Sequence, residues 1–271
     1  MNIYHFKANK ILQPYISRYW VWEGQFQLPC MLPGTGAELI FLYGAPISLQ
    51  NTAITTPSSK SMLLLPRHKN FTFKPTKSPI KFIAIRFRHN ALRHFCAHPI
   101  IEMIDRNITA EDIWGNMGAQ IENRLQQPQT IEQKIEILNH FLCTQLQQNH
   151  KDQHPWLDQA LYHLYYQAPQ HNTLDSVIGK TQVSTRYFQK IFKYNTGVSP
   201  KYFQKTARFE HIMKTLLLND NQAYLDCVLA HGYYDQSHFI KDFKQFTGQA
   251  PLAYLQNKNN RTHFYNSPLS N

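Results

Sequence analysis

The hydrophobic residues of this chain follow two different periods. Up to about residue 108, short runs rich in β-branched and aromatic residues lie between prolines and glycines. Closely spaced runs of this kind are typical of an antiparallel β-sandwich or barrel. The runs are Tyr19–Trp22, Glu38–Tyr43, Ser61–Leu65, Asn70–Phe73 and Ile80–Phe87. We therefore expect a β-rich N-terminal domain.

From residue 109 the period becomes that of amphipathic helices. Ile113, Met117, Ile121 and Leu125 share one face of a first helix. Thr130, with Gln133 three residues later, has the spacing of a capping box at the start of a second helix. The apolar stripe of that second helix is Ile131, Ile135, Leu138, Leu142 and Leu146. These helices, at about 109–147, complete a first domain that we place at residues 1–149.

The rest of the chain has helical periodicity as far as residue 256, after a polar linker at 147–154. We place a second domain at 150–257 and expect a frayed tail at 258–271. The expected fold class is α+β with two domains. The first is a β-sandwich or cupin-like barrel followed by helices, and the second is all-α with two helix-turn-helix units joined by a long helix.

An internal repeat in the second domain indicates its function. The pattern Phe-Lys-x-x-Thr-Gly-x-x-Pro begins at Phe192 and again at Phe243, an offset of 51 residues. Each copy follows a short amphipathic helix, at 174–180 or 224–230, and a capping residue, Ser184 or Asp235. A long helix over 201–217 joins the copies. Two such units on a rigid connector suit DNA, whose successive major-groove faces lie roughly 34 Å apart.

The second helix of each unit carries polar side chains opposite its phenylalanines. Gln can bind adenine, Arg or Lys can bind guanine, and Ser or His can reach bases or backbone. The candidate DNA contacts are Thr185, Arg186, Gln189 and Lys190 in the first unit and Gln236, Ser237, His238 and Lys241 in the second. A solvated basic face is the alternative for either unit alone, and the duplication favours DNA binding.

The net charge of +11 and the pI near 9.4 keep nucleic acid among the candidate partners. Residues 151–258, however, hold only twelve Lys or Arg against eight Asp or Glu. The basic excess is therefore not concentrated in the second domain, and the motifs must identify the partner.

One longer pattern in the second unit is specific for a family. The stretch from Gly232 to Phe243, followed by Phe246-Thr247-Gly248 and Pro251, resembles the signature of the AraC/XylS family of transcription regulators. The resemblance covers about residues 154–256. It implies two helix-turn-helix units on a long helix, with base contacts from all the candidates above except Thr185.

Three positions depart from the family pattern. Ile178 stands where the family usually has a small residue, Gln182 where it has a turn glycine, and Val228 where it has alanine. The first two departures bear on the turn geometry and base specificity of the first unit and leave the expected fold unchanged.

The N-terminal half is similar to cupin-like sensor domains that precede such modules, through residues such as Leu12–Ile16, Glu38–Phe41 and Ile85–Arg88. The resemblance implies a regulatory role without naming what is sensed. Small-molecule pockets combine aromatic and apolar walls with a few polar anchors. The candidates are Trp20, Trp22, Glu38, Phe41, Tyr43, Phe73 and Arg86. The alternatives are a place in the core for each aromatic residue and a structural ion pair for Glu38 and Arg86.

The expected partners are promoter or operator DNA, a small-molecule effector and RNA polymerase. The stripe of the helix at 130–147 suggests a homodimer, because paired half-sites raise affinity and specificity on DNA. The alternative is that this stripe packs on its own sandwich. In the favoured mechanism the effector changes how the second domain is presented, or how two chains are spaced.

The sequence gives less support to disulfides, metal sites or enzyme activity. The four cysteines, Cys30, Cys96, Cys143 and Cys227, are widely spaced, and we expect them to be reduced. His94 and His98 have a helical spacing that could hold a metal, but an ordinary helix face is the favoured interpretation. No phosphate loop, nucleophile elbow or carboxylate pair is present. We expect no cofactor or metal, and a cupin-like metal-dependent enzyme fused to a DNA-targeting module is the alternative function.

The sequence also predicts the compartment. The longest apolar runs are far shorter than the roughly 20 residues of a membrane span. The N-terminal residues lack the basic and apolar segments of a signal peptide. We therefore expect a cytoplasmic protein.

Overall fold

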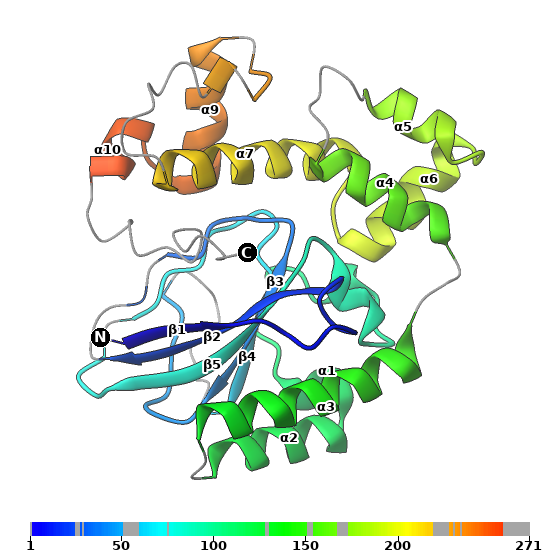
Figure 1. Ribbon diagram of the computed structural model, residues 1–271. Coiled ribbons are helices and arrows are strands. Elements are labelled where there is room, and N and C mark those ends of the chain that lie inside the picture. Colours follow the sequence, from blue (N-terminus) through cyan, green and yellow to red (C-terminus); the bar gives the residue numbers. More distant parts are fainter. Residues whose placement is uncertain are drawn as a thin grey trace.

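The computed structural model describes residues 2–24, 28, 30–50, 60–74, 76–127, 130–150, 154–166, 173–218, 228–229, 231–233 and 235–256. An N-terminal domain contains the sheet, and a C-terminal helical domain lies above it in Figure 1. The long helix α7 (Pro200–Leu218) runs across the top of the sheet domain. The expected α+β arrangement is confirmed.

A five-stranded antiparallel sheet forms the centre of the N-terminal domain, in the order β1-β2-β5-β3-β4. The strands are β1 (Asn2–Phe6), β2 (Ile16–Gly24), β3 (Ala37–Leu42), β4 (Ser61–Leu64) and β5 (Ile80–Phe87). The expected run at 70–73 contributes only single bridges, Met31↔Phe71 and Leu49↔Phe73. Short irregular segments therefore cover one face of the sheet instead of a second set of long strands.

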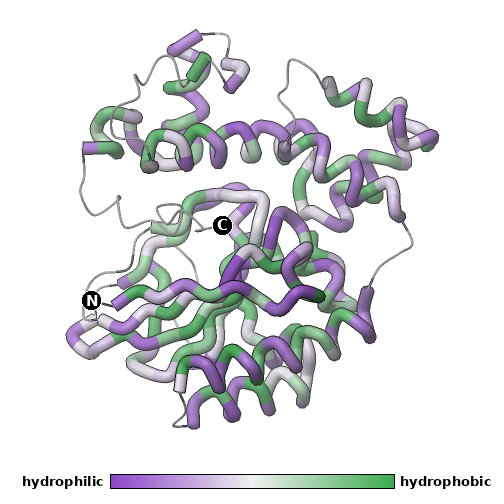
Figure 2. Tube along the Cα trace, in the orientation of Figure 1, coloured by the Kyte–Doolittle hydropathy of each residue, from purple (hydrophilic) through white to green (hydrophobic). Residues whose placement is uncertain are grey.

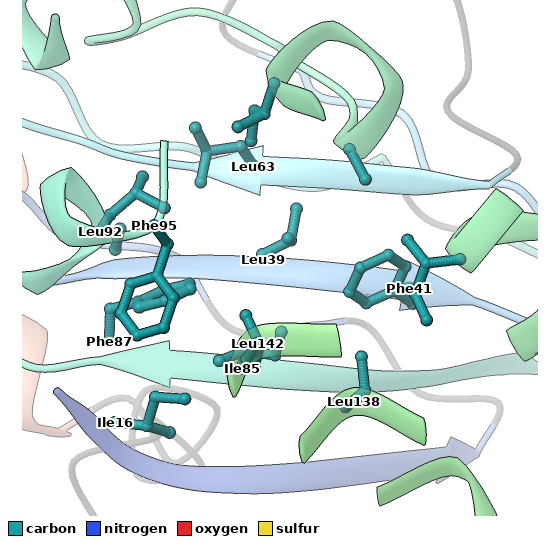
Figure 3. Close-up of a cluster of buried hydrophobic side chains, with 14 of the residues drawn as sticks. Ile16, Leu39, Phe41, Leu63, Ile85, Phe87, Leu92, Phe95, Leu138 and Leu142 are labelled. Atoms are coloured by element: carbon teal, nitrogen blue, oxygen red, sulfur yellow. The ribbon is translucent and has the colours of Figure 1, made fainter. Parts of the chain in front are cut away.

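Side chains alternate between the two faces of the sheet, and both faces are buried. One face packs against α1 (Ala110–Trp114), α2 (Asn116–Gln126) and α3 (Ile131–Asn149). The single first helix that the periodicity predicted is wrong: the left-handed Gly115 divides it into α1 and α2, and Met117 is exposed. Figure 3 shows Leu39, Phe41 and Ile85 of this face near Leu138 and Leu142 of α3. The opposite face carries Trp20, Trp22, Ile40 and Phe82 under the bridged segments.

The apolar stripe of α3 packs on its own sheet. The capping box at its start is present: Thr130 accepts a hydrogen bond from the Gln133 amide, and Gln133 accepts one from the Thr130 amide. Leu138 and Leu142 are fully buried, and Ile135 and Leu146 are nearly so. This is the second of the two alternatives for the stripe, so the feature that favoured a dimer is already used within one chain.

The C-terminal domain has two hydrophobic clusters, one on each half of α7. Its other described helices are α4 (Pro155–Tyr166), α5 (Leu174–Lys180), α6 (Thr185–Thr196), α9 (Gln236–Thr247) and α10 (Pro251–Gln256). Phe203 packs with α4, α5 and α6, whereas Phe209 and Met213 pack with α9 and α10. Hydrophobic and hydrophilic segments alternate along α7 in Figure 2, as expected of an amphipathic helix.

Two expected segments fall largely outside the described residues. Of the helix predicted at 224–230, Val228 and Leu229 are described and are helical. The tail from residue 257 onward lies outside the described part of the chain.

Candidate DNA-binding helices and interdomain cavity

The first helix-turn-helix unit consists of α5, a turn and α6. The Ser184 hydroxyl caps α6 by accepting a hydrogen bond from the Tyr187 amide at 3.3 Å. The turn residue Gln182 has a φ of 56°. This is the left-handed region that glycine adopts most readily, and Gln182 stands where the family pattern has glycine. The turn thus keeps its left-handed geometry without the residue that relieves its strain.

The candidate DNA contacts of α6 form an exposed row. Phe188 and Phe192 hold the helix on the core, and both are fully buried. The exposed candidates are Thr185, Arg186, Gln189 and Lys190. The outward face of α6 and the two inward phenylalanines are therefore those that the periodicity predicts, whereas Tyr187, which the same periodicity places inward, is exposed.

The second unit repeats this plan around α9. Asp235 caps the helix by accepting a hydrogen bond from the His238 amide at 2.7 Å. Gly232 occupies the turn with a φ of 77°. Phe239 and Phe243 are fully buried. The exposed candidates are Gln236, Ser237, His238 and Lys241.

A buried carboxylate ties α9 to α7. The side chain of Asp242 is 5% exposed and lies 2.6 Å from Lys205 Nζ. The Tyr233 hydroxyl donates a second hydrogen bond to it at 3.2 Å. His238 Nε2 is 3.8 Å from the same carboxylate, so this candidate DNA contact also faces Asp242.

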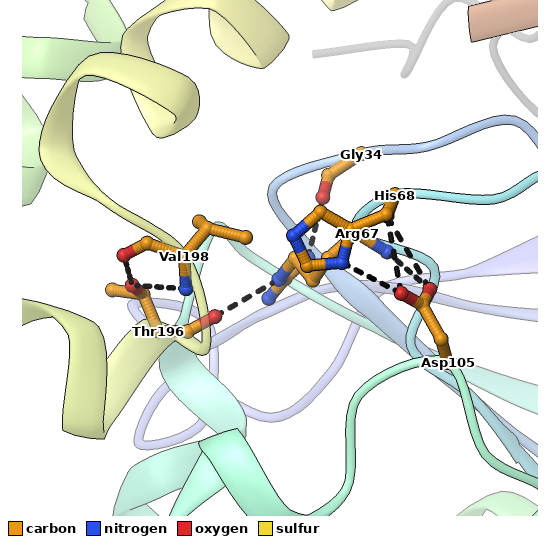
Figure 4. A network of polar contacts seen from close by, with 6 residues as sticks. All are labelled: Gly34, Arg67, His68, Asp105, Thr196 and Val198. Atoms are coloured by element: carbon orange, nitrogen blue, oxygen red, sulfur yellow. Dashed lines mark hydrogen bonds and ion pairs between the residues drawn. The ribbon is translucent and has the colours of Figure 1, made fainter.

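The sheet domain donates hydrogen bonds to the C-terminal end of α6. Arg67 is buried, and its guanidinium donates to the carbonyls of Thr196, Gly34 and Gly36. Figure 4 shows Arg67 between the Gly34 loop and the end of α6. Asn90 donates a further hydrogen bond to the Asn195 carbonyl. No sequence pattern indicates the role of Arg67, because an arginine that follows a buried strand carries no periodic or motif signal.

A second set of contacts joins the sheet domain to α4. Arg93 NH2 lies 2.6 Å from Asp158 Oδ1, and His94 Nε2 lies 3.3 Å from the same atom. The His94 ring stacks on that of His150 with centroids 4.7 Å apart. His94 therefore serves the domain contact, whereas His98 is exposed.

The predicted ligand pocket inside the sheet domain is mostly filled by side chains. Trp20, Trp22 and Phe73 belong to the buried cluster on one face. The remaining void beside Glu38 measures only about 10 Å³. Phe41 lies on the opposite face, under the helices. Trp20 and Phe73 line this small void, whereas Trp22 and Phe41 do not, so these four aromatic candidates are core residues that enclose no ligand-sized cavity among the described residues.

Two further candidates lie at the edges of the sheet domain. The half-buried Tyr43 donates its hydroxyl to Glu23 at 3.3 Å, and the Lys134 ammonium lies 4.9 Å from its ring centroid. Arg86 points to the domain boundary, where it pairs with Glu38 at 3.5 Å and with Glu210 of α7 at 3.4 Å. For Glu38 and Arg86 the alternative of a structural ion pair is therefore the one that the structure contains.

The larger free volumes lie between the domains. One cavity of about 150 Å³ is bounded by β2, the end of β5, α4 and α7. A second, of about 470 Å³, lies beside it, with Tyr15 on one side and Leu161 and Tyr162 of α4 on the other. Arg88 and His89 line both. The second volume is within the range of small-molecule sites.

Burial shifts the acid-base behaviour of two side chains near these cavities. Burial raises the pKa of Glu38 to about 7, against the lowering effect of Arg86 and Arg18. Burial also lowers the pKa of His89 to about 3, and Arg88, His211 and Arg86 lower it further. His89 is therefore neutral at physiological pH.

The described residues contain little that would make another kind of site. Among them, no group of three or more His, Cys, Asp or Glu side chains is arranged to hold a metal ion. Cys96 is buried, Cys30 and Cys143 are half-buried, and all three are free thiols, whereas Cys227 lies outside the described residues. None of the described helices combines the length and the hydrophobicity that a membrane span requires.

Two family models match this chain. Residues 179–257 match a helix-turn-helix domain, and residues 4–109 match a domain of unknown function. A stretch of 101 residues is 26% identical to the uncharacterized HTH-type transcriptional regulator YtdP of Bacillus subtilis. The helix-turn-helix match and this relative agree with the resemblance to AraC-type transcription regulators. The matched stretch is 37% of this chain and 13% of YtdP, so the chain spans only a small part of that relative.

Solved structures of the regulator ToxT from Vibrio cholerae are also similar. One has a TM-score of 0.49 at 11% identity and covers 88% of this chain and 97% of its own. Another, with an unsaturated fatty acid bound, has a TM-score of 0.45 at 12% identity and covers 92% of this chain and 96% of its own.

Proposed function

We propose that this regulator reads duplex DNA with α6 and α9, placing one helix in each of two successive major-groove segments. The observation that carries the proposal is the position of two capped helices of 12 residues each at opposite ends of α7. α7 has 19 residues, or about 28 Å at the rise of an α-helix. That length approaches the roughly 34 Å between successive groove faces.

The exposed side chains on the two helices have the chemistry for base contacts. Gln189 and Gln236 can bind adenine, and Arg186 can bind guanine with two hydrogen bonds. Lys190 and Lys241 can reach guanine or phosphate. Thr185, Ser237 and His238 complete the set, with contacts to bases or backbone.

The sheet domain is the proposed sensor. An effector shifts a regulator only if it binds two arrangements of the domains with different affinity. Arg67, Asn90 and Arg93 contact the helical domain and fix the end of α6 and the start of α4. An effector that moves these residues would therefore change the position of the helical domain. The output is then promoter occupancy or contact with RNA polymerase.

A mobility-shift experiment with genomic DNA fragments tests DNA reading. The wild-type chain, at physiological salt and with excess competitor DNA, should select discrete fragments. The double variant Arg186→Ala, Lys241→Ala should select none. A matched control, Lys74→Ala, Lys77→Ala, removes the same charge from exposed positions of the sheet domain and should behave as the wild type. Failure of the wild type to select any fragment, with and without a cell extract of small molecules, would contradict the proposal.

Gln236→Ala separates base reading from phosphate contact. A base contact costs about 1 to 3 kcal/mol when removed and relaxes preference at one position of the site. The measurement is the affinity for a selected fragment and for single-base variants of it. Equal weakening on all sequences would assign Gln236 to the backbone instead.

A further inference from the structure

The smaller interdomain cavity has a strongly basic lining. Arg18, Arg86 and Arg88 reach it from the sheet domain, and Lys214 reaches it from α7. Among the described residues that line it, Glu210 is the one carboxylate. Positive charge from two domains therefore converges on a volume of about 150 Å³.

The carboxylates near the cavity already have hydrogen-bond or ion-pair partners. Glu210 accepts a hydrogen bond from the Thr35 amide at 3.0 Å and pairs with Arg86 at 3.4 Å. Glu38, which does not line the cavity, lies 3.5 Å from Arg86. Two carboxylates thus face three guanidinium groups and an ammonium group.

The cationic groups of the cavity affect one another. Burial lowers the pKa of Arg18, and Arg86 and Arg88 lower it further, whereas Glu38 raises it. Like charges held together in a half-buried place repel one another, and an anion placed among them relieves that repulsion. Guanidinium groups also match oxyanions in geometry, because each can donate two parallel hydrogen bonds.

We propose that this cavity binds a small oxyanion with two negative charges, which bridges the sheet domain and α7. At roughly 30 Å³ for each water-sized group, the cavity has room for an inorganic oxyanion or a dicarboxylate of two or three carbons. A bridging anion would hold α7, and with it both DNA-binding units, in one position relative to the sensor. That regulatory meaning rests on the proposed function, whereas the binding itself does not.

Two histidines in the same cavity should make anion binding depend on pH. His89 and His211 both line it. The His89 ring lies 4.1 Å from Tyr165 and 4.8 Å from Tyr166 of α4, with Arg86, Arg88 and His211 as the charged or titratable groups around it. His211 contacts the Tyr165 carbonyl at 2.8 Å.

His211 also has charged and titratable neighbours of its own. Glu210 and Lys214 flank it on α7, and the His231 ring lies 6.5 Å away. A bound anion favours the protonated form of a nearby histidine. Anion affinity should therefore rise as the pH falls.

Thermal unfolding of the full chain tests anion binding with sulfate as the probe, because sulfate does not titrate near neutral pH. At pH 7.5, sodium sulfate should raise the midpoint in a saturable way beyond sodium chloride of equal ionic strength. Lys214→Gln should weaken sulfate binding about tenfold, the value of a charged hydrogen bond. Lys201→Gln, at an exposed position of the same helix, should bind as the wild type. No excess stabilisation over chloride, or an unchanged Lys214→Gln, overturns the proposal.

The pH dependence gives an independent readout. If the anion restores the pKa of one histidine to about 6.5, sulfate should bind about fourfold tighter at pH 6 than at pH 8. His89→Asn should lose most of this ratio while still binding sulfate at pH 8, because asparagine tolerates the left-handed backbone of this position, where φ is 28°. Equal affinity of the wild type at both pH values overturns the proton coupling.

Two further probes identify the source of the anion. Tighter binding of phosphate than of oxalate at pH 7.5 assigns the site to inorganic oxyanions, and the reverse order assigns it to short dicarboxylates. Tighter binding of decanoate than of all three small anions overturns the assignment to a small dianion. The mobility-shift experiment is separate: sulfate binding without selected DNA fragments refutes only the regulator, and selected fragments without sulfate binding refute only this site.

Discussion

The two helix-turn-helix units share one plan but differ in their surroundings. The end of α6 is buried against the sheet domain, where Arg67 and Asn90 donate to its last carbonyls. At the same place in the repeat, a Cβ added to Gly197 would clash with Ile104 of the sheet domain, whereas one added to Gly248 would meet nothing within 4 Å. A movement of the sheet domain therefore acts on the first unit through polar contacts to the end of α6, whereas it meets the second unit through an apolar contact, Leu32 in the cluster of α7, α9 and α10.

The two units also differ inside: a buried ion pair in the second unit stands where the first unit has an apolar contact. The second unit buries Asp242 against Lys205 and Tyr233. The repeat places Ile191 at the corresponding position of the first unit, where it packs against the hydrophobic cluster of α4, α5 and α6. The comparison teaches that a duplicated motif keeps its local geometry while its buried contacts diverge with the neighbour that each copy has acquired.

The largest expected difference between the units concerns the two glycines that end α6 and α9. Both have left-handed backbones, with φ of 81° at Gly197 and 76° at Gly248. Gly248→Ala should lower the free energy of unfolding by about 1 kcal/mol from backbone strain. Gly197→Ala should lower it by about 3 kcal/mol, because it also overpacks against Ile104. Urea unfolding measures both, and equal losses would show that the sheet domain does not hold the first unit.

The next effect concerns the buried carboxylate of the second unit. Asp242→Asn removes the charge that Lys205 pairs with and should cost about 2 kcal/mol, less than a fully buried pair because Lys205 is 23% exposed. Hydrogen exchange should increase in α9 and leave α6 protected. Asp175→Asn, at an exposed position of the first unit, is the matched control. Equal loss of protection in both helices would show that the two units unfold together.

The helix caps should have a smaller and nearly equal effect. Ser184→Ala and Asp235→Ala each remove the acceptor for an amide at the helix start. Each should cost about 1 kcal/mol, with Asp235→Ala slightly more costly because its carboxylate also interacts with the helix dipole. The change in midpoint of thermal unfolding is the measurement. An effect of Ser184→Ala well above that of Asp235→Ala would contradict the equivalence of the two local structures.

The smallest effect concerns the turns. Gln182→Gly should raise the free energy of unfolding by about 0.5 kcal/mol, because the relief of left-handed strain exceeds the entropy that glycine adds to the unfolded chain. In the second unit, Gly232→Ala should lower the free energy of unfolding, because alanine is strained in a left-handed backbone. Urea unfolding of the two variants side by side checks the signs. A destabilised Gln182→Gly would mean that the glutamine side chain makes contacts that outweigh the strain.

Several parts of the fold and of the candidate site follow from sequence patterns. The strands β2, β3, β4 and β5, the capped helix α3, and the capped helices α6 and α9 lie where the periodicity predicted them. The exposed faces of α6 and α9 carry the predicted polar residues. The ligand candidates show the limit of such patterns, because Trp20 and Phe41 both look like pocket walls but lie on opposite faces of one sheet.

What the sequence alone determined are features set by neighbours within a few residues: the caps at Ser184 and Asp235, the inward phenylalanines, and the repeat that makes two helix-turn-helix units. Only the tertiary structure decided which residues join the domains. Arg67 and Thr196 lie 129 residues apart in the chain, and the cavity lined by Arg86 and Lys214 exists only once α7 lies across the sheet domain. The physical reason is the distance along the chain over which each kind of interaction forms. Hydrogen bonds of a cap or a turn close over three or four residues, whereas burial and charge clustering depend on distant segments that no local pattern connects.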